Sequence, residues 1–148
     1  PYGTSKKVNE ATAYTTPFGI NNQVGLRFTT VYGEGSRKTM FMGKLMRGEL
    51  EYATNHVRDF IHVSDVVNAI MIFINTGTKG KLPAYNVGTG TGHIVSKLAQ
   101  LKKPDIEIRE GHECEALDNT ADNSDLRALG WEPKINARGY LQNDGNVL

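Results

Sequence analysis

Tyr2 and Lys6, close to the start of the chain, have the residue types and the spacing to do chemistry. On a helix, residues four apart lie on the same face, one turn from each other. A phenol titrates near pH ~10, and a neighbouring ammonium lowers that pKa because it favours the phenolate. The pair could therefore make a tyrosine act as a general acid or base near neutral pH. The same spacing is also typical of a solvated helix face, so the pair alone leaves both interpretations open.

Five more motifs follow the Tyr-x-x-x-Lys pair along the chain, and their order and distances matter more than any one of them. The six segments are Pro1 to Lys6, Gly25 to Gly33, Arg58 to Val67, Tyr85 to Gly90, Arg109 to Gly111 and Asp125 to Pro133. Together they resemble the second half of an extended short-chain dehydrogenase/reductase, in the subgroup of nucleotide-sugar epimerases and dehydratases. The resemblance runs from residue 1 to about residue 133, and residues 134–148 match no motif.

The resemblance implies an α/β fold and an NAD cofactor. The fold would be the C-terminal portion of a doubly wound Rossmann-type sheet plus a small α/β substrate-binding lobe, with residues 1–148 forming one C-terminal half. The glycine-rich turn that binds the dinucleotide pyrophosphate in such folds has no counterpart here, nor does the family's upstream catalytic Ser or Thr. We therefore expect a fragment or one piece of a split enzyme, with the N-terminal dinucleotide-binding half absent and the fragment inactive alone.

The family's functional positions can be carried onto this sequence residue by residue. The resemblance implies that Tyr2 is the catalytic base and that Lys6 lowers its pKa and hydrogen-bonds the nicotinamide ribose. Phe28 would join both of them in contacting the cofactor. Arg58 would hold the diphosphate of a nucleotide-diphosphate sugar, and Arg109 would supply a second diphosphate contact. Taken alone, each arginine is equally typical of a strand-edge residue in a salt bridge.

Thr30 and Arg37 bear on which sugar would be bound. Thr-Val-Tyr-Gly followed by an arginine resembles the branch that epimerises UDP-glucuronate at C4, in which this Thr and Arg meet the uronate carboxylate. An arginine in that loop also fits an ordinary surface position. The chain departs from the branch at Lys38 and Thr39, and from many relatives at Glu34, so a generic UDP-hexose stays open as an alternative.

Three functions are compatible with the motifs. The first is an NAD-dependent epimerase that inverts C4 of a UDP-hexose or UDP-hexuronate by hydride transfer. The second is a 4,6-dehydratase or reductase of the same family, and the third is a non-catalytic subunit that binds nucleotide sugars or takes part in assembly. For the first two, the expected protein partner is a second copy in a homodimer or the complementary N-terminal half.

Composition excludes several other classes. Seventeen basic and sixteen acidic residues give a net charge of +1, so nothing indicates nucleic-acid binding. The longest apolar run, residues 69–74, is far shorter than the ~20 residues that span a bilayer, so no membrane partner is expected. The lone Cys114 excludes a disulfide framework and favours a cytoplasmic location. The four histidines lack the spacing of metal ligands, so no metal is expected.

Strands and helices alternate in the sequence pattern, as in other α/β proteins. The pattern predicts helices over 5–16, 39–47, 64–75, 94–101 and 125–129, and strands over 24–31, 50–53, 60–63, 85–87 and 106–109. Pro17 and Gly19 would end the first helix, and Gly48 and Gly130 would end the second and the last. A buried aliphatic stripe is expected on the third helix, formed by Val66, Val67, Ala69, Ile70 and Ile74. Trp131 is expected to pack and to do no chemistry.

Overall fold

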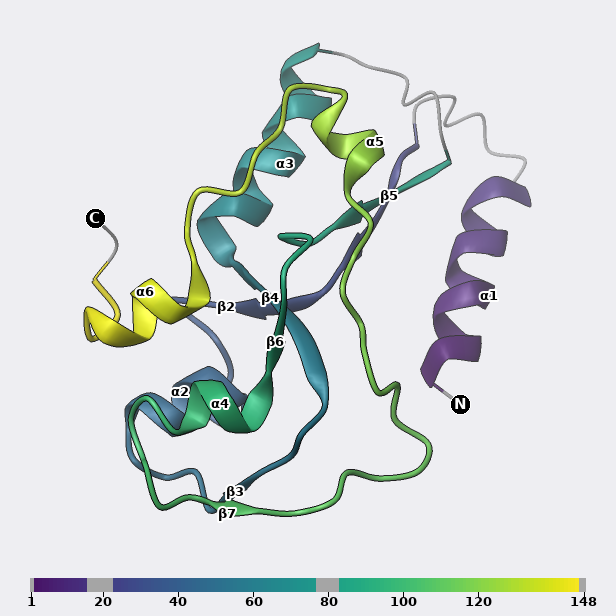
Figure 1. The fold of residues 1–148 in the computed structure, drawn as a ribbon. Helices are drawn as coiled ribbons and strands as arrows, with labels where there is room; N and C mark the ends of the chain where they lie inside the picture. The colour runs from purple at the N-terminus through teal and green to yellow at the C-terminus, as the bar shows by residue number, and fades with distance from the viewer. Residues whose placement is uncertain (1, 16–22, 77–82, 147–148) are drawn as a thin grey trace.

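Helices and strands alternate along the chain in a computed structural model, which describes residues 2–15, 23–76 and 83–146 (Figure 1). The elements are α1 (Tyr2–Thr15), β1 (Gly25–Phe28), β2 (Thr30–Tyr32), α2 (Phe41–Met46), β3 (Tyr52–Ala53), β4 (Val57–His62), α3 (Val63–Thr76), β5 (Ala84–Val87), β6 (Gly92–Ile94), α4 (Val95–Ala99), β7 (Glu107–Ile108), α5 (Ser124–Arg127) and α6 (Ala137–Gln142). The expected α/β class is confirmed. The ends that Pro17 and Gly19 were expected to impose on the first helix lie outside the described residues.

Three small sheets connect these elements. β1 pairs with β5 in parallel, β2 pairs with β4 in parallel, and β3 pairs with β7 in parallel. β6 joins the other edge of β4 in the antiparallel sense. The prediction of one continuous strand over 24–31 is wrong, because the chain changes partner at Thr29. Its backbone N–H still donates to Val87 at 3.1 Å, and the next residue already pairs with Phe60.

Two hydrophobic clusters lie on either side of this change of partner. The first is formed by α3, α5 and the strands β4 and β5, and its buried residues are Ile61, Val66, Ala69, Tyr85, Val87, Leu126 and Trp131. The second fills the space between α2, α4 and α6, and includes Tyr32, Met42, Leu45, Phe60, Leu98 and Leu141. Adjacent residues of β4, Phe60 and Ile61, therefore belong to different clusters, as expected for a strand buried on both faces.

Residues after 133, for which the sequence predicted nothing, form part of the fold. The carboxylate of Asp65 on α3 accepts hydrogen bonds from the backbone N–H groups of Lys134 and Ile135, both at 3.0 Å. The indole N–H of Trp131 donates to the Asp65 carbonyl at 3.1 Å, so the packing role expected for Trp131 is confirmed. α6 follows and buries Leu141 completely.

Part of the expected stripe on α3 faces outward. Val66 and Ala69 are buried, but Val67 and Ile74 are 49% and 66% exposed, so their assignment to the core is wrong. The reason is rotational, because positions 67, 71 and 74 share one helix face while 66 and 69 share another. This helix begins at Val63, one residue before the predicted start, and the Ser64 N–H donates to the His62 ring.

Most remaining predictions differ from the structure only at element ends. Gly48 and Gly130 adopt the left-handed conformations (φ of 72° and 87°) that end α2 and the turn after α5, as expected. The second and last predicted strands, over 50–53 and 106–109, shorten to β3 and β7, and β6 was not predicted. No helix within the described ranges has the length and apolar character to cross a membrane.

Candidate functional site

Tyr2 and Lys6 meet on α1, as their spacing predicts. The Lys6 ammonium lies 5.2 Å from the centroid of the Tyr2 ring, and the Tyr2 side chain is 76% exposed. The Ser5 hydroxyl donates to the Tyr2 carbonyl at 2.7 Å, within the same first turn. The phenol oxygen is thus open to a ligand from the solvent side, and the lysine stands one helical turn away.

A bidentate ion pair links α1 to the sheet. Arg27 on β1 donates to the Glu10 carboxylate at 2.8 and 2.7 Å, and these hydrogen bonds hold the pKa of Glu10 below its ordinary value. Arg27 also lines a pocket of about 300 Å³ together with Phe28, whose ring is 47% exposed. The pocket lies at the carboxyl ends of β1 and β5, which is where ligands bind in open α/β sheets. Tyr2 is two helical turns, roughly 12 Å, from Glu10 along α1.

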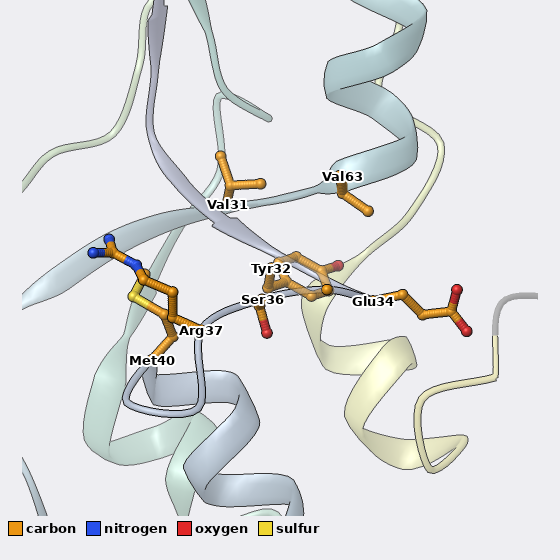
Figure 2. A pocket seen from close by; sticks show the side chains of 8 residues that line it. Val31, Tyr32, Glu34, Ser36, Arg37, Met40 and Val63 are labelled. Carbon is orange, nitrogen blue, oxygen red and sulfur yellow. The ribbon is translucent and has the colours of Figure 1, made fainter.

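A second pocket, of about 290 Å³, opens where β2 ends (Figure 2). Its lining consists of Val31, Tyr32, Glu34, Gly35, Ser36, Arg37, Met40 and Val63. Arg37 is part of this lining, and its side chain extends away from that of Glu34; its contact with a uronate carboxylate stays a prediction. Thr30, one residue before Val31, does not belong to this lining.

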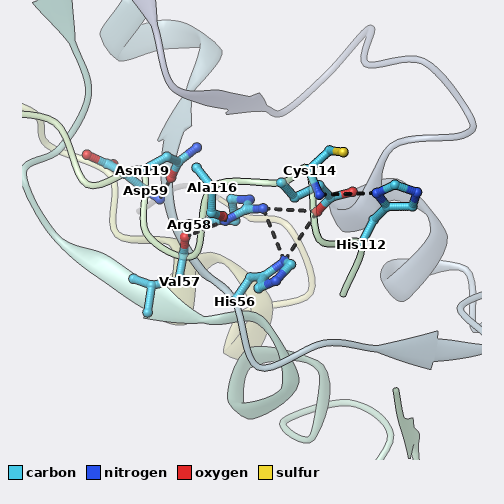
Figure 3. A network of polar contacts seen from close by, with 9 residues as sticks. His56, Val57, Arg58, Asp59, His112, Cys114, Ala116 and Asn119 are labelled. Carbon is cyan, nitrogen blue, oxygen red and sulfur yellow. Dashed lines mark hydrogen bonds and ion pairs between the residues drawn. The ribbon is translucent and has the colours of Figure 1, made fainter. Parts of the chain in front are cut away.

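Arg58 lies within a polar network on β4 (Figure 3). One terminal nitrogen, Nη1, donates to the carbonyls of Val57 and Ala116 at 2.8 and 2.7 Å. The other, Nη2, donates to the Glu115 carboxylate at 3.1 Å and lies 3.3 Å from Nδ1 of His56. The guanidinium thus connects β4 to the segment that follows β7.

Asp59, the next residue of β4, is not among the hydrogen-bond partners of Arg58. Its carboxylate is fully buried and accepts hydrogen bonds from the Thr89 N–H and hydroxyl at 2.9 and 2.7 Å. It also accepts the N–H groups of Gly90 and Ala121 at 2.9 and 3.2 Å. These hydrogen bonds fix two loops against β4. Asp59 and Arg58 have different partners because successive residues of a strand point to opposite faces of the sheet.

Arg109 has a separate set of contacts. Its guanidinium forms a bidentate pair with Glu107 at 2.7 and 2.8 Å and stacks over the Tyr52 ring at 4.3 Å. Its backbone N–H donates to the Ala53 carbonyl at 2.9 Å and continues the pairing of β3 with β7. The partners of Arg109 are thus different from those of Arg58, and the joint role of the two arginines stays a prediction.

Sequence reasoning did not find the partners of Arg58. The spacing of the four histidines gives no reason to select His56, and none of the six motifs includes Glu115. A usable signal was the glycine of Arg-Glu-Gly, because a Cβ at Gly111 would lie 1.8 Å from the His56 ring. Gly111 thus allows the segment to pass directly over His56.

Parallel strands, covering helices and a Tyr-x-x-x-Lys pair on the first helix define the short-chain dehydrogenase/reductase class of α/β proteins. Residues 1–88 match the model of the NAD dependent epimerase/dehydratase family. The chain belongs to that family.

Similar proteins extend the match beyond residue 88. UDP-glucuronic acid decarboxylase 5 of Arabidopsis thaliana is 27% identical over 161 residues, covering 95% of this chain and 45% of that protein. MoeE5, solved in complex with UDP-glucuronic acid and NAD, is 30% identical with a TM-score of 0.64, covering 78% of this chain and 43% of that one. The UDP-glucuronic acid 4-epimerase from Bacillus cereus, solved with UDP-glucuronic acid and NAD, has a TM-score of 0.79 at 22% identity, covering 98% and 51%; at that identity the likeness is one of fold.

These comparisons confirm the resemblance to NAD-dependent nucleotide-sugar enzymes and the Rossmann-type fold class. The chain spans about half the length of the curated relatives it matches.

Proposed function

We propose that this chain is the C-terminal half of an NAD-dependent epimerase that inverts C4 of a UDP-hexose or UDP-hexuronate. The observation that carries the proposal is the Lys6 ammonium beside an exposed Tyr2 ring, in a chain that belongs to the epimerase/dehydratase family. The relatives differ in the fate of the sugar, so the choice of epimerisation among their reactions rests on Thr30 and Arg37. Dehydration or reduction of the sugar is the alternative within the family.

Tyr2 is the proton-transferring residue in this proposal. Its phenolate takes the proton from the sugar 4-hydroxyl and returns it to the same oxygen after the 4-keto sugar has presented its other face. NAD, when bound, supplies the acceptor for the hydride that leaves C4 and then gives it back. Lys6, one helical turn from Tyr2, would hydrogen-bond the nicotinamide ribose. The exposed Phe28 ring, which lines a pocket at the carboxyl end of β1, fits a cofactor contact.

Arg37 and Thr30 would recognise a uronate carboxylate. Arg37 lines the pocket at the end of β2, and an arginine binds a carboxylate through a rigid pair of N–H donors. MoeE5 has been solved with UDP-glucuronic acid and also with UDP-glucose, so the preference for a uronate in this proposal rests on Arg37 and Thr30. Thr30 would reach the sugar from the start of β2. Arg58 and Arg109 would bind the diphosphate.

The complete enzyme would need a second polypeptide region against this chain. The outward face of α3 carries Val67, Met71 and Ile74, all exposed, at the spacing of one helix stripe. β1 pairs with β5 and has a second edge, to which a further parallel strand could add. An N-terminal dinucleotide-binding half, or a second copy in a homodimer, would cover these surfaces.

The test is an assay of the protein as its gene encodes it, supplied with NAD and with UDP-glucuronate or UDP-glucose. Proton NMR of the products identifies inversion at C4 by the changed coupling of the C4 proton. A 4-keto-6-deoxy sugar would instead establish dehydration, and release of carbon dioxide would establish the reaction named for the Arabidopsis relative. Absence of turnover with every sugar would leave the non-catalytic binding subunit as the surviving interpretation.

A further inference from the structure

The guanidinium of Arg58 already has an anionic partner. Its side chain is only 17% exposed, whereas that of Glu115, which accepts from Nη2 at 3.1 Å, is 56% exposed. The two acceptors on Nη1 are backbone carbonyls of the fold itself. Glu115 is therefore the solvent-facing partner of Arg58 and the one that an incoming anion meets first.

A phosphate oxygen and a carboxylate oxygen compete for the same hydrogen-bond donors of a guanidinium. Both accept charge-assisted hydrogen bonds from the planar N–H donors, and each arginine nitrogen has a limited number of them. Nη2 of Arg58 has two hydrogens, and its neighbours are the Glu115 carboxylate and the His56 ring. A diphosphate can thus use this nitrogen fully only after Glu115 has moved away.

The backbone around Glu115 permits that movement. On one side the Glu115 N–H bonds to His112 at 2.9 Å, and on the other the Leu117 carbonyl accepts from the Val57 N–H at 2.8 Å. The second of these bonds holds the segment against β4 without the Glu115 side chain. Rotation of the exposed Glu115 side chain therefore removes its carboxylate from Nη2 of Arg58 and from Nδ1 of His56, which it also meets at 3.2 Å, and no strand pairing has to break.

We propose that Glu115 is a built-in competitor for the diphosphate of the nucleotide sugar, and that it sets the affinity of the Arg58 site. This inference rests on the proposed function, in which Arg58 binds that diphosphate. Glu115 occupies Nη2 when the site is empty and repels the incoming negative charge. A ligand with two phosphates displaces it, whereas a weaker anion does not.

The test is calorimetric titration with UDP of the protein as its gene encodes it, comparing Glu115→Gln with Glu113→Gln. Both substitutions remove one negative charge, and Glu113 is exposed with no ion-pair partner among the described residues. Removing an ion pair with one exposed partner should tighten UDP binding about 3- to 10-fold in Glu115→Gln. Glu113→Gln should bind like the parent. Equal affinities for the two variants, or weaker binding by Glu115→Gln, would overturn the proposal.

A double-mutant cycle separates this inference from the assignment of Arg58. If Glu115 acts through Arg58, the gain from Glu115→Gln disappears when Arg58→Gln is also present. A gain that persists overturns the competition, while UDP binding that Arg58→Gln leaves unchanged overturns the diphosphate role of Arg58. Failure of every variant to bind UDP overturns both. Glu115→Asp retains the charge and should bind UDP like the parent. Circular dichroism of each variant shows whether a change in UDP binding comes with a loss of folding.

Discussion

The helix α1 and the strand β4 both carry candidate functional residues, but the fold holds them in opposite ways. The described side chains of α1 are exposed except at two half-buried positions, and Tyr2 and Lys6 are among the exposed ones. β4 has a strand on each edge, and its last four residues are buried. The residue that would do proton chemistry thus lies on an element with little packing, and the residue that would bind diphosphate lies on the best-packed strand.

Because α1 is loosely packed and β4 is buried, substitutions on these two elements should affect activity and stability differently. A substitution at Tyr2 removes a group that packs against little, so activity and folding should respond independently. A substitution on β4 disturbs buried partners on both faces, so any loss of binding there is mixed with loss of stability. The predictions below test that division, beginning with the largest effect.

Tyr2→Phe should reduce turnover of the natural protein about 10²- to 10⁴-fold, which is the contribution of a positioned general acid–base group. The ring remains and only the ionisable oxygen is lost. The unfolding free energy of the chain should stay the same, because the Tyr2 side chain is mostly exposed.

Lysines 6 and 7 offer a matched control on the same helix. Lys6→Met should lower turnover as well, whereas Lys7→Met should leave it unchanged, since Lys7 lies on a different face. Steady-state kinetics and urea titrations measure the two quantities separately. Turnover of Tyr2→Phe within a few-fold of the parent would dismiss the catalytic assignment.

Arg37 is intermediate between the exposed helix α1 and the buried strand β4, because it lies on an exposed loop that follows the buried Tyr32. If it pairs with a uronate carboxylate, Arg37→Ala should cost roughly 2–5 kcal/mol in transition-state stabilisation for UDP-glucuronate. UDP-glucose has no carboxylate to lose, so its kcat/KM should change little. The neighbouring Lys38→Ala serves as the control. Equal losses for both sugars would place Arg37 on their shared diphosphate.

Asp59→Asn should have the largest effect on stability, lowering the unfolding free energy by about 2–4 kcal/mol. The amide cannot accept all the donors that meet the carboxylate, and its own N–H₂ faces backbone N–H groups. Asp105→Asn, at an exposed position, should be neutral. Urea denaturation followed by circular dichroism measures both. A loss at Asp59 no larger than that at Asp105 would mean that the two loops are held by other contacts.

Features that depend on a few neighbouring residues could be predicted from the sequence, whereas features that depend on which strand lies alongside could not. The Tyr2–Lys6 spacing, the left-handed Gly48 and Gly130, and the packing of Trp131 each follow from a few neighbouring residues. The break at Thr29 could not be seen, because the apolar pattern continues across it while the neighbouring strand changes.

Long-range polar contacts were also beyond local patterns. Glu115 reaches Arg58 across 57 positions, and Asp65 reaches Ile135 across 70. Asp65 lies in the first turn of α3, where an acidic residue interacts favourably with the helix dipole, and local pattern shows no more than that. Its carboxylate instead holds the segment leading to α6, which no motif had indicated.

The ion pair that links α1 to β1 gives the smallest expected effect and a direct test of how this helix is held. Arg27 lowers the pKa of Glu10 from 4.5, so the folded state favours the carboxylate. The contribution to stability is therefore present above about pH 4.5 and is lost as the pH falls through the lowered pKa of the folded state. Because the pair is exposed, its loss should loosen α1 locally and leave the rest of the fold intact.

Hydrogen-exchange protection factors of the α1 amides, compared between pH 6 and pH 3, measure this loosening. Protection in α1 should fall over that interval more than protection in β4. Glu10→Gln should reduce protection in α1 at the higher pH and remove most of its pH dependence. Glu49→Gln breaks an exposed pair of the same kind, with Arg47, at a site remote in sequence from α1 and should leave α1 as in the parent. If Glu10→Gln instead retained the full pH dependence, the helix would be held by contacts other than this pair, and the contrast between α1 and β4 would be smaller than the exposure of Tyr2 indicates.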